Sequence, residues 1–140
     1  MKKVFTLDTT LRDGMQSEKI SFTVEDKLKI MRYLDRLGVD YIEAGNPGSN
    51  VKDAEFFDRV RGETLSHAKL AAFGSTRKVG IRPEQDDNLA KLLSAGTRAV
   101  VIFGKASSLH VSEVLRTTPE ENLAMIHDSI TYLREKGKEV

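Results

Sequence analysis

Cysteine and tryptophan are both absent from the 140 residues. The lack of cysteine excludes a disulfide scaffold, a cysteine nucleophile, a thiolate zinc site and a cysteine-ligated iron–sulfur cluster. Neither sign of charge is in excess, because 22 Lys and Arg face 21 Asp and Glu. Net charge therefore gives no reason to expect nucleic acid or an anionic membrane as a partner. No apolar run approaches the roughly 20 residues that cross a bilayer, and the first residues lack the apolar segment of a signal peptide. We expect a cytoplasmic protein with no nucleic-acid or membrane partner.

Short apolar segments alternate with helical patterns along the chain. The apolar segments predict strands at residues 4–7, 41–43, 69–73 and 99–103, with a further strand beginning near residue 139. The helical patterns predict helices at 24–37, 53–61, 84–95 and 119–136. The last helix begins with a proline at its first position and a Thr-x-x-Glu capping box from Thr118 to Glu121. Strands that alternate with helices predict parallel pairing, and therefore an α/β fold.

Two architectures fit this α/β pattern. A (β/α)8 TIM barrel needs about 250 residues. The chain would then hold four βα units, with residues 1–140 forming the N-terminal half of the catalytic barrel and ending near the start of strand five. The alternative is a complete flavodoxin-like, doubly wound sheet of four or five strands. The strand that begins at the last residues favours the half-barrel.

The densest polar cluster runs from Asp8 to Gln16, directly after the first expected strand. In a parallel α/β fold, this loop lies at the C-terminal edge of the sheet, where active sites assemble. The carboxylate of Asp13 suits a hard divalent cation. The guanidinium of Arg12 can donate two hydrogen bonds to an oxygen that gains negative charge. The same residues also fit two structural roles, a turn capped by Asp8 and a surface ion pair between Arg12 and Asp13.

Polar residues follow the other expected strands at the same edge. Glu43 closes the second strand, where its carboxylate either meets a cation or is exposed at the rim. Ser75 and Thr76 follow the third strand, and they fit the capping of a turn as well as binding. His110 follows the fourth strand, and of the three histidines only this one is expected on this side of the sheet.

These segments together resemble a known family. The stretch Asp8-Thr9-Thr10-Leu11-Arg12-Asp13-Gly14-Met15-Gln16 is similar to the signature of the DRE-TIM metallolyases. That superfamily contains 2-isopropylmalate synthase, homocitrate synthase and 3-hydroxy-3-methylglutaryl-CoA (HMG-CoA) lyase. Segments 20–28, 41–50, 72–77 and 103–111 resemble the citramalate synthase branch.

The resemblance implies a metal-dependent TIM barrel that condenses acetyl-CoA with a 2-oxo acid in branched-chain amino-acid biosynthesis. Pyruvate, giving citramalate, is the first expectation, and a 2-isopropylmalate-type reaction is the next. The resemblance also implies that Arg12 and Glu43 are catalytic and that Asp13 binds a divalent metal, which can be Mg²⁺, Mn²⁺ or Zn²⁺. By the same resemblance, Gln16 and His110 contact the substrate.

One part of the family pattern is missing from the chain. The family completes its metal site with a His-x-His pair from a later strand, so the remaining ligands are expected outside this chain. We expect the 140 residues to be inactive alone and, because a half-barrel leaves open sheet edges, to associate as a homodimer. Two alternatives stay open. One is an HMG-CoA-lyase-like carbon–carbon lyase, which the same residues would serve, and the other is a non-catalytic half-barrel scaffold.

Overall fold

The computed structural model describes residues 3–140. Four parallel strands form one sheet in sequential order: β1 (Leu7–Asp8), β2 (Tyr41–Glu43), β3 (Lys69–Ser75) and β4 (Ala99–Phe103). The strands alternate with four longer helices: α1 (Val24–Leu37), α2 (Val51–Arg59), α3 (Asp87–Ser94) and α4 (Pro119–Glu135). Three short helical segments lie in the loops, at Gly14–Gln16, Pro83–Gln85 and His110–Leu115.

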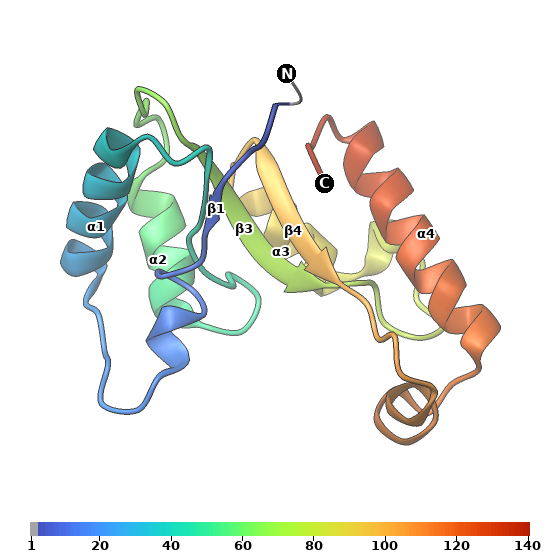
Figure 1. Ribbon diagram of the computed structural model, residues 1–140. Coiled ribbons are helices and arrows are strands. Elements are labelled where there is room, and N and C mark those ends of the chain that lie inside the picture. Colours follow the sequence, from blue (N-terminus) through green and yellow to red (C-terminus); the bar gives the residue numbers. More distant parts are fainter. Residues whose placement is uncertain (1–2) are drawn as a thin grey trace.

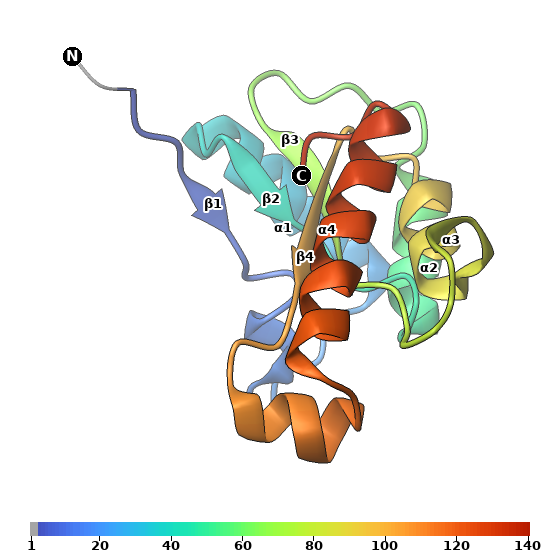
Figure 2. The same cartoon turned by 90° about the vertical axis from the view of Figure 1, so that its right-hand side faces the viewer.

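The helices cover one face of the sheet. In Figure 1, α1 and α2 lie to one side of the strands, α3 lies behind them and α4 lies to the other side. The quarter turn in Figure 2 shows that no helix in the described residues covers the opposite, concave face. A doubly wound sheet has helices on both faces and reverses its strand order, whereas a barrel wall keeps the sequential order. The expected α/β class with parallel strands is confirmed, and the flavodoxin-like alternative is wrong.

The hydrophobic core lies between the sheet and the helices. Alternation along β3 sends Leu70 and Ala72 toward the helices, so Ala71 and Phe73 face the concave side. Helix α1 contributes apolar side chains at helical spacing, among them Leu28 and Met31. A Thr-x-x-Asp capping box starts α1, and Gly38, with a φ of 86°, ends it in the left-handed conformation that glycine tolerates best.

Three elements start at a different residue from the sequence-based expectation. Strand β1 begins at residue 7 rather than 4, because the Asp40 carboxylate accepts the backbone N–H of Thr6 at 2.8 Å, ahead of the strand ladder. Helix α2 begins two residues early because Asn50 caps it. Helix α3 begins late because Asp86 caps it, which leaves the expected proline start as a separate short turn.

The expected fifth strand is present as a single bridge. Glu139 pairs in parallel with Ala99, and its backbone bonds Arg98 and Val100 at 3.1 and 2.8 Å. Its carboxylate crosses the concave face to the hydroxyl of Tyr41 and, at 2.8 Å, to the ammonium of Lys69. This one bridge therefore extends the hydrogen bonding of the sheet beyond β4, on the edge opposite β3. No helix in residues 3–140 has the length and apolarity of a membrane span.

Candidate active site on the concave face

The β1–α1 loop is folded by its own backbone. The carbonyl of Thr9 accepts the N–H groups of Arg12, Asp13 and Gly14 at 3.1, 2.8 and 3.2 Å. The Asp8 carboxylate accepts the N–H of the residue two positions on, at 3.0 Å, which is the Asx turn considered from the sequence. Leu11 is fully buried and anchors the loop. The turn is compatible with a functional role, because it presents the side chains that follow it.

Arg12 and Glu43 form an ion pair on the concave face. The Arg12 Nε donates to Glu43 Oε1, and the guanidinium carbon lies 4.1 Å from the centroid of the Phe73 ring. The Glu43 side chain is 1% exposed and that of Arg12 is 19% exposed. The open question about Glu43 is thereby answered, because its carboxylate meets a cation and is not exposed at the rim. The pairing fixes the plane of the guanidinium and leaves Nη2 without a hydrogen-bond partner in residues 3–140.

Asp13 completes a chain of three charges. Its Oδ1 accepts from Arg12 Nη1 at 2.9 Å, and its side chain is 61% exposed. The Arg12–Asp13 ion pair considered from the sequence therefore exists, and one Asp13 oxygen stays available for another ligand. Nowhere in residues 3–140 do three His, Asp or Glu side chains converge on a common point. Asp13 can supply one metal ligand, but the described residues do not by themselves form a metal site.

Gln16 and His110 stand apart from these charges. Gln16 is exposed at the end of the Gly14–Gln16 turn, and His110 is exposed at the start of the His110–Leu115 helix. Within residues 3–140, no hydrogen bond or ion pair connects either side chain to Arg12, Asp13 or Glu43. Their roles in substrate contact stay predictions.

An aromatic stack beside the charges was not anticipated from the sequence. Phe73 and Phe103 stack with ring centroids 5.4 Å apart and an interplanar angle of 10°. Arg12 contacts the Phe73 ring, and the Lys105 ammonium lies 5.1 Å from the centroid of the Phe103 ring. The β3–β4 register pairs Phe73 with Val101 and Ser75 with Phe103. The two-residue period of neighbouring strands could have identified this face, once their register was known.

Arg77 follows β3 at the same edge of the sheet, and its pairing with α4 was not predicted from the sequence. Its buried guanidinium donates from Nε and Nη2 to Asp128 at 3.0 and 2.8 Å, and from Nη1 to Glu121 at 2.8 Å. The hydrogen bonds from Arg77 hold the pKa values of both carboxyls below their usual range. Glu121 therefore does not complete the capping box expected at Thr118, although the Thr118 side chain still caps α4. The seven-residue spacing of Glu121 and Asp128 on one helix face was the available signal.

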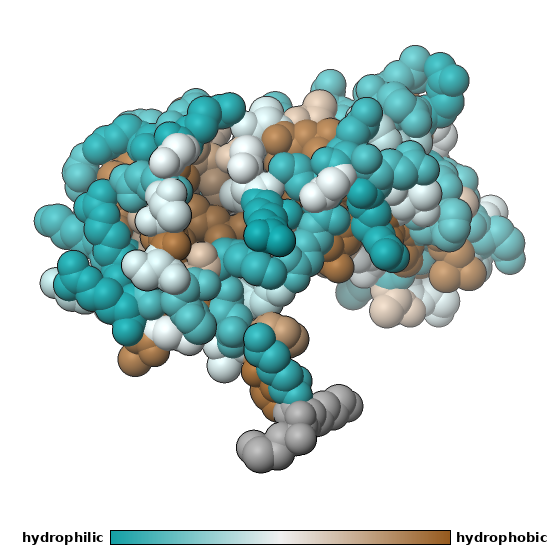
Figure 3. Space-filling view, turned by 90° about the horizontal axis from the view of Figure 1, so that it is seen from above, coloured by the Kyte–Doolittle hydropathy of each residue, from teal (hydrophilic) through white to brown (hydrophobic). Residues whose placement is uncertain are grey.

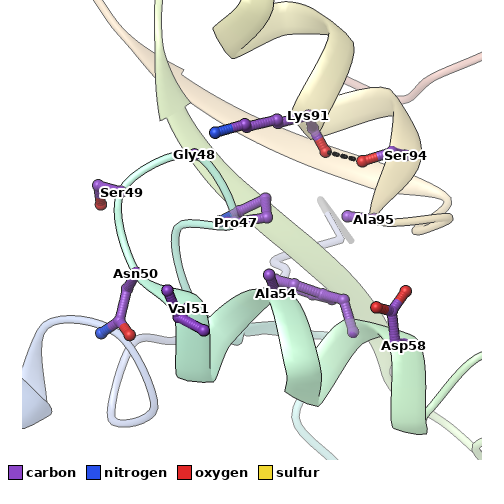
Figure 4. Close-up of a pocket in the computed structure, with 11 residues that line it drawn as sticks. Pro47, Gly48, Ser49, Asn50, Val51, Ala54, Asp58, Lys91, Ser94 and Ala95 are labelled. Carbon is purple, nitrogen blue, oxygen red and sulfur yellow. Dashed lines mark hydrogen bonds between the residues drawn. The ribbon is translucent and has the colours of Figure 1, made fainter.

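Two cavities lie apart from the Arg12–Glu43 ion pair. A cleft of about 400 Å³ opens between α2 and α3 in the outer layer, and Figure 4 shows Lys91 reaching across it from α3 toward the loop that precedes α2. None of the expected site residues lines this cleft. A second hollow of about 370 Å³ lies at the ends of β3 and β4, where Arg77, Phe103 and Lys105 line it.

Comparison with known proteins identifies the family. A family profile described as HMGL-like matches residues 3–140. The chain belongs to the HMGL-like family. The resemblance expected from the sequence is therefore confirmed.

Curated relatives of this HMGL-like chain are longer than it is. An (R)-citramalate synthase of Geobacter sulfurreducens is 51% identical over 140 residues, which are all of this chain and 26% of that protein. A 2-isopropylmalate synthase of Shouchella clausii is 35% identical over 136 residues, or 97% of this chain and 26% of that protein. The chain thus spans about a quarter of the length of these relatives.

A solved structure shares the fold. The HMG-CoA lyase of Bacillus subtilis superimposes with a TM-score of 0.73 at 21% identity, over 99% of this chain and 45% of that one. At this identity the likeness concerns the fold alone.

Proposed function

We propose that residues 1–140 form the N-terminal half of a TIM-barrel catalytic domain. We propose further that the whole protein transfers the acetyl group of acetyl-CoA to a 2-oxo acid, with pyruvate as substrate and citramalate as product. The observation that carries the proposal is the guanidinium of Arg12, held on the concave face between buried Glu43 and exposed Asp13. The higher identity to citramalate synthases than to 2-isopropylmalate synthases supports pyruvate over the larger oxo acid. The reaction would serve branched-chain amino-acid biosynthesis in the cytoplasm, as the sequence suggests.

Arg12 is suited to the charge that such a condensation creates. A base takes a methyl proton from acetyl-CoA, and the resulting carbon attacks the keto carbon of the oxo acid. The π-electron pair of the keto C=O bond then moves to the oxygen, which becomes an alkoxide. Water afterwards cleaves the thioester and releases CoA. Donors that are already oriented toward a developing oxyanion stabilise it far more than free donors do. Glu43 orients Arg12 through Nε and Asp13 accepts from Nη1, so Nη2 stays free for the alkoxide. We assign the base to none of the described residues.

Asp13 would contribute one ligand to a divalent metal, which can be Mg²⁺, Mn²⁺ or Zn²⁺. When bound, such a metal supplies Lewis-acid polarisation of the keto oxygen. The remaining ligands would come from outside this chain. Gln16 and His110 would contact the oxo acid from the loops that follow β1 and β4. The chain alone would therefore be inactive.

A substrate comparison on the full-length protein tests this proposal. We expect metal-dependent release of CoA from acetyl-CoA with pyruvate, and slower release with 2-oxoisovalerate. Faster release with 2-oxoisovalerate would favour the isopropylmalate-type reaction. Cleavage of HMG-CoA without any condensation would favour the lyase alternative, and no turnover of any substrate would favour the non-catalytic scaffold.

The open edges of the sheet support a homodimer as part of the proposal. Strand β1 pairs only with β2 in the described residues, and Leu7 of β1 is exposed together with Val4 and Phe5 of the segment before it. Figure 3 shows this segment projecting from the body of the molecule, with hydrophobic side chains along it. An exposed strand edge with apolar side chains favours pairing with another chain.

A further inference from the structure

A buried ion pair joins α1 to α2 behind the site. The ammonium of Lys27 contacts Asp53 Oδ1, and the two side chains are 0% and 7% exposed. The ring of Phe56 lies 5.0 Å from the ammonium. Burial lowers the pKa of Lys27, and the hydrogen bond to Asp53 opposes that effect. Buried ion pairs are weak contributors to stability, because the loss of hydration offsets the attraction between the charges. Stability alone therefore does not explain why this ion pair is buried.

The second carboxylate oxygen of Asp53 is bonded to the loop after β2. Asp53 Oδ2 accepts the backbone N–H of Asn46 at 2.7 Å. Gly45, with a φ of 148°, lies directly against the same carboxylate, where a Cβ would be 2.6 and 2.7 Å from its two oxygens. Only glycine combines this backbone conformation with so close an approach. The carboxylate thus fixes the path of the Gly45–Asn46 backbone.

The other side of the same segment is fixed by β3. Ala44 donates to the carbonyl of Ala71 at 3.0 Å, and Phe73 donates to the carbonyl of Gly45 at 2.9 Å. Glu43 directly precedes this segment and binds Arg12, while Phe73 lies under the Arg12 guanidinium. A shift of the segment would therefore move both contacts that orient Arg12.

We propose that Lys27 and Asp53 are positioning residues for the Arg12–Glu43 pair. Asp53 holds the segment 44–46 against β3 through the N–H of Asn46, and Lys27 neutralises and orients Asp53. The hydrogen bond from Asn46 to Asp53 is the contact that fixes segment 44–46. The charge of Lys27 compensates the charge of Asp53 and so allows this carboxylate to be buried. The catalytic consequence rests on the function proposed above, but the contact itself belongs to this chain.

Two double variants separate the hydrogen bond from the charges. Lys27→Met with Asp53→Asn removes both charges and keeps an oxygen that can accept from Asn46. Lys27→Met with Asp53→Leu removes both charges and the acceptor. Because both variants remove the buried charges together, neither leaves a charge unpaired. Urea unfolding of both is expected to show a cooperative transition.

The readout is the Arg12 Nε–H signal in a ¹H–¹⁵N NMR spectrum of this chain, assigned by its loss in Arg12→Lys. We expect exchange with solvent to be as slow in the Asn double variant as in the wild type. In the Leu double variant we expect it to be at least about fivefold faster, as for a weakened hydrogen bond to a charged group. Equal exchange rates in all three proteins would overturn the proposal.

Gly45→Ala keeps the proposal testable if the Leu double variant does not fold. This change keeps both residues of the ion pair and forces the residue-45 backbone and the Asp53 carboxylate apart. Faster Nε–H exchange is again expected, and an unchanged rate would count against a positioning role.

A kinetic measurement on the full-length protein then shows the catalytic consequence. The Leu double variant should lose kcat for CoA release, and the Asn double variant should recover it. An inactive wild type together with the expected NMR result would reject the proposed function and leave the positioning role intact. An active wild type whose Leu double variant exchanges and turns over normally would reject only the positioning role.

Discussion

Replacing Arg12 by alanine should destabilise this chain far more than the loss of an ordinary ion pair. Glu43 is 1% exposed, and within residues 3–140 its one ion-pair partner is Arg12. Arg12→Ala therefore leaves a buried carboxylate without a counter-charge, which costs about 3–5 kcal/mol. The stacking of the guanidinium on Phe73 is lost as well. We expect the free energy of unfolding, measured in urea by circular dichroism, to fall by that amount.

The matched control is Arg59→Ala. Arg59 pairs with Glu25, but the two side chains are 46% and 61% exposed. A solvated pair of this kind contributes about 0–1 kcal/mol. The double variant Arg12→Met with Glu43→Leu should recover most of the stability lost in Arg12→Ala, because it leaves no charge unpaired. If Arg12→Ala lost no more stability than Arg59→Ala, the reasoning about the buried carboxylate would be refuted.

Three further predictions concern other parts of the chain. Asp35 is buried, which raises its pKa, but three backbone N–H donors of the loop before β3 outweigh burial and hold the pKa below its usual range. The stabilising effect of Asp35 is therefore present at neutral pH and lost as the pH falls through that lowered pKa. Asp35→Ala should lower the free energy of unfolding by about 3 kcal/mol at pH 7 and should flatten its dependence on pH in the acid range. An unchanged dependence in the acid range would contradict this prediction. Asp13→Ala should leave the unfolding midpoint unchanged, because the side chain is 61% exposed. In calorimetric titration of the full-length protein, the same change should abolish metal binding. A metal affinity equal to that of the wild type would reject Asp13 as a ligand. The wild-type chain should be a dimer in light scattering at tens of micromolar, and a monomer at that concentration would refute self-association.

Much of the fold could be predicted because local patterns determined it. Strand β4 and helix α1 agree with the sequence pattern, since an apolar run and a capped amphipathic stretch are local signals. Side-chain hydrogen bonds moved three other starts, two through the local caps Asn50 and Asp86 and one through a long-range contact. The long-range contact is made by the Asp40 carboxylate, which comes 34 residues after Thr6, whose N–H it accepts. Such long-range contacts leave no periodic trace in the sequence.

The residues of the candidate site could be predicted from the sequence, but the buried side chains that support them could not. Arg12, Asp13 and Glu43 were expected from a motif and a strand end, and the structure joins them. Lys27 sits on a helix where lysine is usually solvated, so its burial could not be foreseen without the position of Asp53 on the next helix. Pairing across elements depends on packing, and a single sequence does not specify packing.

The central claim is that Arg12 stabilises the negative charge that develops in an acetyl-CoA-dependent condensation. The direct measurement is kcat for CoA release from acetyl-CoA and pyruvate by the full-length protein and two variants, with folding confirmed for each by circular dichroism. Arg12→Ala should lower kcat by about 10²–10³-fold, as for the loss of one oxyanion donor. The kcat of Arg12→Lys should lie between those of the wild type and Arg12→Ala, because a lysine keeps the charge beside Glu43 but lacks the planar guanidinium. Folded Arg12→Ala with the kcat of the wild type would contradict the account.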